Sequence, residues 1–169
     1  TNILLEDATN IFKLSQNGHN LIILAETVLD EIDTKKSGFE EINFQAREFA
    51  RILENATIIE SIKRDLYKII RLKINDKNTF IDIISKEEYE VNIKNVSLNI
   101  INDRKILEIA KFANIYYTTQ VEFLSLDIMA RTRAISLDIK TDALVGKDKD
   151  VFEFEFTKNI TINFEDLEF

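Results

Sequence analysis

The chain has 169 residues, of which 45% are hydrophobic, so it is the size of one domain that can bury a core. It has no cysteine, which excludes disulfides and thiolate chemistry, and no long apolar stretch, so we expect a soluble cytoplasmic protein without a membrane span. The net charge of −8 opposes simple electrostatic binding to nucleic acid, unless acidic side chains converge on metal ions.

The amino-terminal part of the chain predicts helices on either side of a buried strand. A loop leads into a short helix at about 8–16, and the apolar run at 20–25 is short enough for a buried parallel strand. Thr27 and Asp30 have the spacing of a capping box, which predicts a helix at about 27–36.

The middle of the chain changes from helical to β character. After Gly38, apolar side chains at helical spacing predict a helix within 39–56. Within residues 57–99, the segments YKIIRLKI, TFIDIIS and YEVNIKNVSL (89–98) are rich in β-branched side chains and alternate in polarity, which predicts a β-rich insertion that forms a small sheet or hairpin. Helical periodicity returns at 101–113.

The remaining segments predict a second buried strand at 121–126 and a helix at 128–137. Strict alternation at 151–156 predicts an edge strand, within a β-rich tail or link to a following domain at 151–169. Strands that alternate with helices predict a single α/β domain, with a central parallel sheet covered on both faces in three α/β/α layers. Ligands of such sheets usually lie at the carboxyl ends of the strands.

Three carboxylates recur in equivalent places, where a strand ends or a helix begins: Glu31, Asp103 and Asp127. Convergent carboxylates in a chain without cysteine suit Mg²⁺ or Mn²⁺, which prefer oxygen ligands. Such ions could activate water for attack on a phosphodiester. Helix caps and the helix dipole also favour acids at these places and could alone explain Asp103 and Asp127, whereas Glu31 borders the buried face of its helix.

Several other polar residues have both a functional and an ordinary interpretation. His19 lies in a predicted turn, which favours an exposed loop imidazole over a catalytic base. Ser125 could hold a metal-bound water or a phosphate oxygen, or bond only to nearby backbone. Arg47, Arg131 and Arg133 are placed where they could meet a phosphate backbone, although solvated helix faces would also explain them.

Four short segments, in this order, resemble the acidic motifs of the PIN-domain ribonuclease family: TNILLED, TVLDEID, INDRKIL and FLSLDIMARTRA. The segment NFQAREFARIL resembles a helix of the PIN domains that are fused to PhoH-like ATPases. The β-rich region at 57–99 falls where that subgroup has an insertion. The resemblance therefore implies a PIN-like α/β/α domain over 1–169.

The resemblance also implies the roles of individual residues. Glu31, Asp103 and Asp127 would be catalytic metal-binding acids, Asn2 and Ser125 would support them, and Arg47, Arg131 and Arg133 would contact RNA. The family's first aspartate would stand immediately before Thr1, together with most of the first, central strand.

The activity implied is metal-dependent hydrolysis of single-stranded RNA by an endoribonuclease that uses Mg²⁺ or Mn²⁺. The partner implied is a covalently linked PhoH-like ATPase, although no Gly-x-x-x-x-Gly-Lys-Ser/Thr loop occurs in this chain. PIN-like domains commonly dimerise, so a homo-oligomer is also implied. A VapC-type toxin nuclease is disfavoured by the insertion and the β-rich tail. The alternative is a catalytically incomplete PIN-like module that binds RNA or protein.

Overall fold

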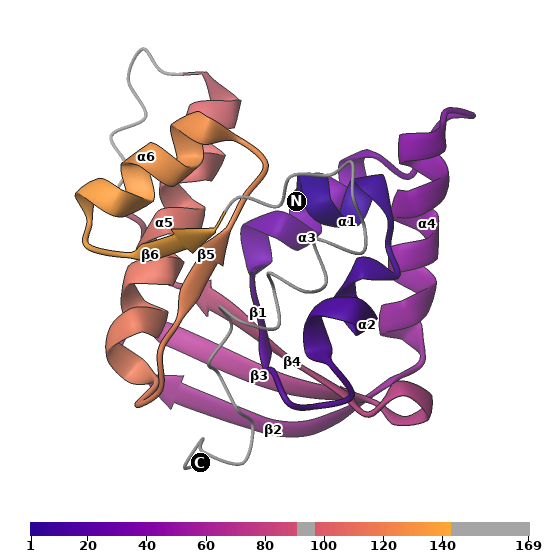
Figure 1. Cartoon of the computed structure of the whole chain (residues 1–169), viewed down its shortest axis with the longest axis horizontal. Coiled ribbons are helices and arrows are strands. Elements are labelled where there is room, and N and C mark those ends of the chain that lie inside the picture. Colours follow the sequence, from indigo (N-terminus) through magenta and orange to yellow (C-terminus); the bar gives the residue numbers. More distant parts are fainter. Residues whose placement is uncertain (91–96, 143–169) are drawn as a thin grey trace.

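The computed structural model describes residues 1–90 and 97–142, which form an α/β fold (Figure 1). Its elements in chain order are α1 (Asn2–Glu6), α2 (Asn10–Ser15), β1 (Ile22–Ala25), α3 (Glu26–Thr34), α4 (Glu41–Glu54), β2 (Ala56–Arg64), β3 (Tyr67–Ile74), the 3-10 helix η1 (Asn75–Lys77), β4 (Thr79–Lys86), α5 (Leu98–Tyr116), β5 (Glu122–Leu124), α6 (Ile128–Ser136) and β6 (Lys140–Asp142).

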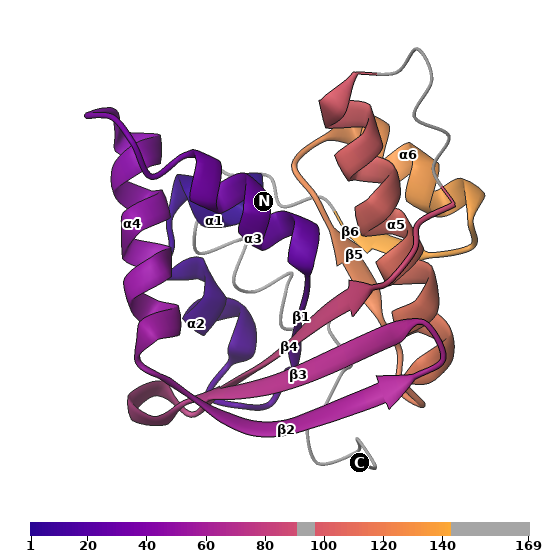
Figure 2. The same ribbon diagram turned by 180° about the vertical axis from the view of Figure 1, so that it is seen from behind.

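The described strands form two sheets. One has four strands in the order β1-β4-β3-β2, and the other consists of β5 and β6 (Figure 2). The pairs β1–β4 and β5–β6 are parallel, whereas β2–β3 and β3–β4 are antiparallel because short connections join them. The α/β class is confirmed, but the larger sheet is mixed, because the region predicted as a β-rich insertion adds three strands beside β1.

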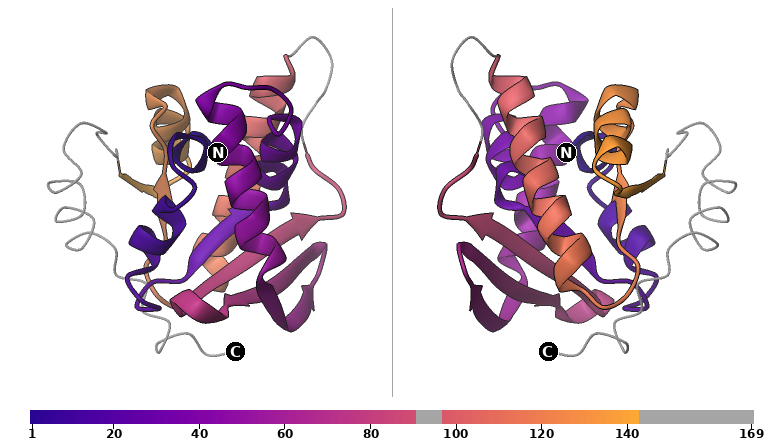
Figure 3. Two further views of the ribbon diagram at one scale, coloured as in Figure 1. Left: turned by 90° about the vertical axis from the view of Figure 1, so that its right-hand side faces the viewer. Right: turned by 90° about the vertical axis from the view of Figure 1, so that its left-hand side faces the viewer.

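Helices flank the strands on both sides. The two views in Figure 3 show α4 in front of the strands from one side and α5 in front from the other. The main core joins these layers, since Phe49 of α4, Ile81 of β4 and Ile109 of α5 are almost completely buried in it. Burial of such large apolar side chains is the main favourable contribution to folding.

The capping box predicted at Thr27 is wrong. Helix α3 begins at Glu26, directly after β1, and its N-cap is Ala25. Thr27 therefore lies inside the first turn, where its side chain is buried and forms a hydrogen bond with Tyr89. The strand runs into the helix without an intervening turn, so no polar cap is present.

The strand predicted within 89–98 is also wrong at its carboxyl end, where Ser97 is the N-cap of α5 and Leu98 is helical. Residues 91–96 of that prediction lie outside the described residues. The predicted edge strand at 151–156 and the tail at 151–169 lie outside them as well.

A buried ion pair joins β3 to β4 and fixes the end of α5. Arg71 lies directly opposite Asp82, and its Nε and Nη2 donate to Oδ1 and Oδ2 at 2.7 and 2.8 Å. The hydroxyl of Tyr117, the C-cap of α5, donates to Asp82 Oδ2 at 2.5 Å. Burial raises the pKa of the Asp82 carboxyl, while the bonds from Arg71 and Tyr117 act in the opposite direction. This cluster therefore anchors α5 on the sheet.

Replacing Asp82→Asn is expected to lower the free energy of unfolding by about 3–5 kcal/mol, because the charge of Arg71 would stay buried without its partner. Urea unfolding followed by circular dichroism measures this. The control Glu87→Gln breaks the exposed Lys63–Glu87 pair and should cost less than about 1 kcal/mol. Equally small losses in both variants would contradict the role given to Asp82.

Candidate functional site

A cavity of about 240 Å³ lies between the two sheets. Residues Ile22–Ala25 of β1 line it, and so do Glu122–Leu124 of β5. Within residues 1–90 and 97–142, β1 pairs with β4 only and β5 with β6 only. In the described residues, β1 and β5 therefore each have one edge without a strand partner. These two edges face each other across a mostly apolar cavity.

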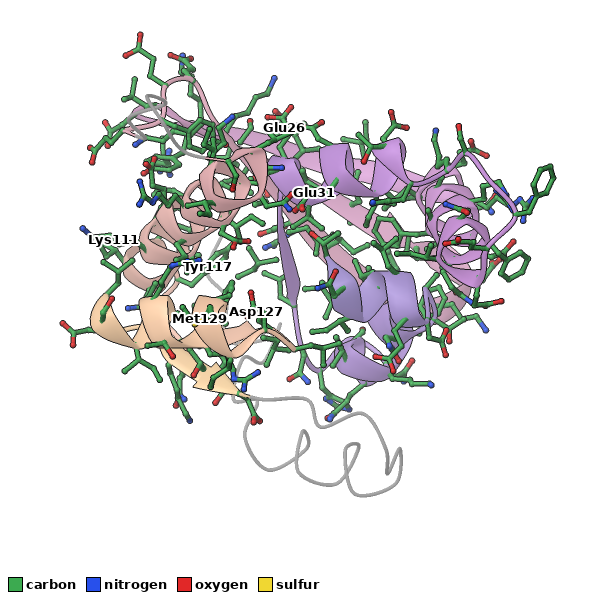
Figure 4. All side chains as sticks on the ribbon, turned by 90° about the horizontal axis from the view of Figure 1, so that it is seen from above. Glu26, Glu31, Lys111, Tyr117, Asp127 and Met129 are labelled. Atoms are coloured by element: carbon green, nitrogen blue, oxygen red, sulfur yellow. The ribbon has the colours of Figure 1, made fainter. Side chains whose placement is uncertain are left out.

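The three predicted carboxylates all line this cavity. Glu31 lies in α3, which follows β1, Asp127 follows β5, and Asp103 lies in the second turn of α5, outside the first turn in which caps favour acids. Figure 4 looks down on this end of the molecule and labels Glu31 on α3 and Asp127 at the start of α6. The carboxyl ends of β1 and β5 thus lead to Glu31 and Asp127, and α5 adds Asp103 to the same cavity, at a place where α/β proteins commonly bind ligands.

Each of these carboxylates has one oxygen in a polar contact. The hydroxyl of Thr1 donates to Glu31 Oε1 at 2.7 Å, and Arg133 Nη1 donates to Asp103 Oδ2 at 3.2 Å. The third acid, Asp127, caps α6, because its Oδ1 accepts from the N–H of Met129 at 2.9 Å. The capping explanation is therefore correct for Asp127, but it does not exclude a second role for a carboxylate that still lines the cavity.

The carboxylates of Asp103 and Asp127 are close enough to affect each other. Burial raises the pKa of the Asp103 carboxyl above its usual range, the charge of Arg133 acts against this, and the charge of Asp127 adds to it. Two carboxylates that repel each other at a cavity edge favour a cation between or beside them.

The loop between β5 and α6 is held in place around Ser125. The Ser125 hydroxyl oxygen accepts from the N–H of Asp127 at 3.1 Å, and Arg131 Nη1 donates to the Ser125 carbonyl at 2.8 Å. These two hydrogen bonds fix the conformation of the loop that places Asp127 after β5. Asn2, the first residue of α1, also lines the cavity and is exposed.

Two of the residues considered from the sequence lie elsewhere. Arg47 is on α4, where its Nη1 donates to the carbonyls of Lys36 and Gly38 at 2.7 and 3.0 Å. It therefore ties the α3–α4 loop to α4, and a contact with RNA stays a prediction. His19 is exposed and does not line the cavity, in agreement with a loop position.

The cavity lining also includes polar residues for which the sequence pattern predicted no role, namely Thr1, Asn20 and Glu122. The side chain of Glu122 is 3% exposed, and Lys140 Nζ of β6 pairs with its Oε1 at 2.7 Å. Its Oε2 is buried and has no hydrogen-bond partner among the residues that the structure describes. No local pattern could have indicated Glu122, because its partner follows only after the whole of α6.

The donor set at the cavity edge is carboxylate, amide and hydroxyl oxygen, which fits the ligand preference of Mg²⁺ or Mn²⁺. Across residues 1–90 and 97–142, however, no three His, Cys, Asp or Glu side chains are close enough together to hold a metal ion. The described acids therefore have the chemistry of a metal site without forming a complete group of three ligands.

The family model described as "PIN domain" matches residues 1–144. The chain belongs to the PIN-domain family. PIN domains are generally nucleases and usually use divalent metal ions, which agrees with the acids at the cavity edge. The resemblance on which the sequence analysis relied is thereby confirmed at the level of the family.

One curated relative is Protein PhoH2 of Bacillus subtilis (strain 168), which is 23% identical over 163 residues. The match covers 88% of this chain and 34% of that protein, so the chain spans about a third of the relative's length. No solved structure matches the chain. Among the helices that the structure describes, none is long and apolar enough to cross a membrane.

Two substitutions at Asp127 test its capping role. Asp127→Ala removes the cap of α6 and is expected to lower the free energy of unfolding by about 1 kcal/mol, whereas Asp127→Asn keeps a good capping side chain and should stay close to the unchanged protein. Chemical denaturation of the three proteins measures this. A greater loss in the Asn variant than in the Ala variant would contradict the assignment.

Proposed function

We propose that this PIN domain is an endoribonuclease that hydrolyses phosphodiester bonds of single-stranded RNA with Mg²⁺ or Mn²⁺. The observation that carries the proposal is the meeting of Glu31, Asp103 and Asp127 at one edge of a cavity. They reach it from three separate elements of a fold whose family generally consists of nucleases.

In this proposal Glu31, Asp103 and Asp127 would hold the ion, and Asn2 and Ser125 would arrange the polar surroundings. A bound divalent ion would activate a water molecule and stabilise negative charge on the phosphate. The protein itself would hold the metal-binding carboxylates in place. The loop between β5 and α6 positions Asp127, and α5, which Tyr117 anchors to the sheet, positions Asp103. Such positioning matters because reacting groups must be held in an attack geometry.

We further propose that the family's first strand, which carries its first acid, belongs in the gap between β1 and β5. Both facing edges lack a strand partner in the described part of the chain, and a strand parallel to β1 and β5 would pair with both. Thr1 lines the cavity together with Asp103, and its hydroxyl donates to Glu31 Oε1 at 2.7 Å. An aspartate joined to Thr1 would therefore lie beside these two acids and could complete the ligand group.

We also propose that the domain, taken as one unit over 1–169, works as a module of a PhoH-like ATPase in the cytoplasm. The similarity to Protein PhoH2 supports this, and so does the segment NFQAREFARIL, which forms most of α4. A motor beside the nuclease could feed it single-stranded RNA. A homo-oligomer is an additional prediction from the family resemblance.

The second candidate is a catalytically incomplete PIN-like module that binds RNA or protein. The observation in its favour is that the described acids include no group of three that is close enough to hold a metal ion. A folded protein that binds RNA without cleaving it in any divalent ion would establish this alternative.

The proposed activity is tested by incubating labelled single-stranded RNA with Mn²⁺, Mg²⁺ or EDTA and a chain extended upstream through the first strand. We expect cleavage that needs the metal and falls by more than about 100-fold in Asp103→Asn, since even the outer partners of metal ligands are worth 10–100-fold. The control Asp65→Asn makes the same change at an exposed hairpin turn and should leave the rate unchanged.

Retention of full activity in Asp103→Asn would contradict the carboxylate mechanism. Absence of cleavage by a folded, extended protein in both metals would instead favour the binding module.

A further inference from the structure

We propose that Arg133 competes with the divalent ion for Asp103 and, when the ion displaces it, binds a phosphate of the RNA backbone. This rests on the proposed function, because it concerns the same cavity edge. It assigns different tasks to Arg131 and Arg133, which the sequence analysis treated alike.

The contact between Arg133 and Asp103 has the properties of an exchangeable ion pair. It consists of one hydrogen bond, from Nη1 to Oδ2 at 3.2 Å, and the two side chains are 34% and 32% exposed. The buried pair of Arg71 and Asp82, in contrast, has two bonds of 2.7 and 2.8 Å and almost no exposure. Partly exposed ion pairs contribute little to stability, so this one can open at small cost.

Arg133 and a cation in the cavity would approach the same carboxylate. Asp103 lines the cavity, whereas Arg133 is not among the lining residues, so the guanidinium contacts Asp103 from outside the cavity. A dication on the cavity side would take up much of the negative charge of Asp103 and would repel the guanidinium. Binding of the dication to Asp103 therefore weakens the contact between Asp103 and Arg133, and that contact weakens binding of the dication.

A released Arg133 would be well suited to a phosphodiester. A guanidinium can donate two parallel hydrogen bonds to a phosphate, and it keeps its charge at any physiological pH. Arg131 is less available, because its Nη1 is bound to the Ser125 carbonyl that helps to position Asp127. The net charge of −8 makes a local cation at the cavity edge important for holding RNA.

Titration of the protein, extended upstream through its first strand, with Mn²⁺ alone tests the competition; the heat of binding is measured by calorimetry in the absence of RNA. Arg133→Ala and Arg133→Gln are both expected to bind Mn²⁺ about three- to tenfold more tightly than the unchanged protein, because a positive charge a few ångströms from the ion has been removed. Arg133→Lys keeps the charge and should show a smaller gain. Arg64→Ala removes the same charge from the end of β2 and should leave Mn²⁺ affinity unchanged.

Binding of a labelled single-stranded RNA in Ca²⁺ tests the second half of the proposal. Here Arg133→Ala is expected to weaken binding by about tenfold, the usual effect of losing a hydrogen bond to a charged group. Asp103→Asn should lose Mn²⁺ affinity, which shows that the metal signal comes from this site.

The outcomes separate this inference from the proposed function. Mn²⁺ affinity that is unchanged or weaker in Arg133→Ala and Arg133→Gln would overturn the inference alone, because Arg133 would then only orient Asp103. An equal gain in Arg64→Ala would overturn it too, since the effect would be one of total charge. Absence of Mn²⁺ binding by the unchanged protein would overturn the proposed function and this inference together.

Discussion

Two strand edges, on β1 and β5, face each other across the cavity, and the common direction of these two strands determines where the site lies. The chain runs through β1 and β5 in the same direction in Figure 1, so it leaves both strands on the same side of the molecule. Glu31 and Asp127 follow these exits, and Asp103 joins them from α5. The position of α5 depends in turn on the buried contact between Tyr117 and Asp82 at its other end.

The positive charges at this edge of the cavity lie next to the carboxylates and do not form an extended basic surface. The chain carries a net charge of −8, so RNA binding cannot rest on a general excess of lysine and arginine. Arg131 and Arg133 are instead local: one holds the loop that carries Asp127, and the other contacts Asp103. A dication among the acids would reverse the sign of the potential that an approaching phosphate meets. Metal binding and RNA binding are therefore expected to be coupled in this domain.

Local pattern predicted the parts of the site that depend on local structure. The apolar run that became β1 and the periodicity of α3 placed Glu31, and the end of the second apolar run placed Asp127. Pairings between distant segments were not predictable in this way. Asp82 was hidden in an alternating strand, and Glu122 pairs with Lys140 on the far side of a helix, so neither has a signature within a short window of sequence. The mixed sheet was missed for a similar reason, since alternation predicts strands but not their order.

The most direct test is a crystal of the protein, extended upstream through its first strand, that is soaked in Mn²⁺ and measured at the manganese absorption edge. We expect one anomalous peak at the cavity edge, within bonding distance of Asp103 and of Glu31 or Asp127, and no such peak in crystals of Asp103→Asn. A well-ordered crystal with manganese bound elsewhere, or with none at this edge, would contradict the claim that these acids form a metal site.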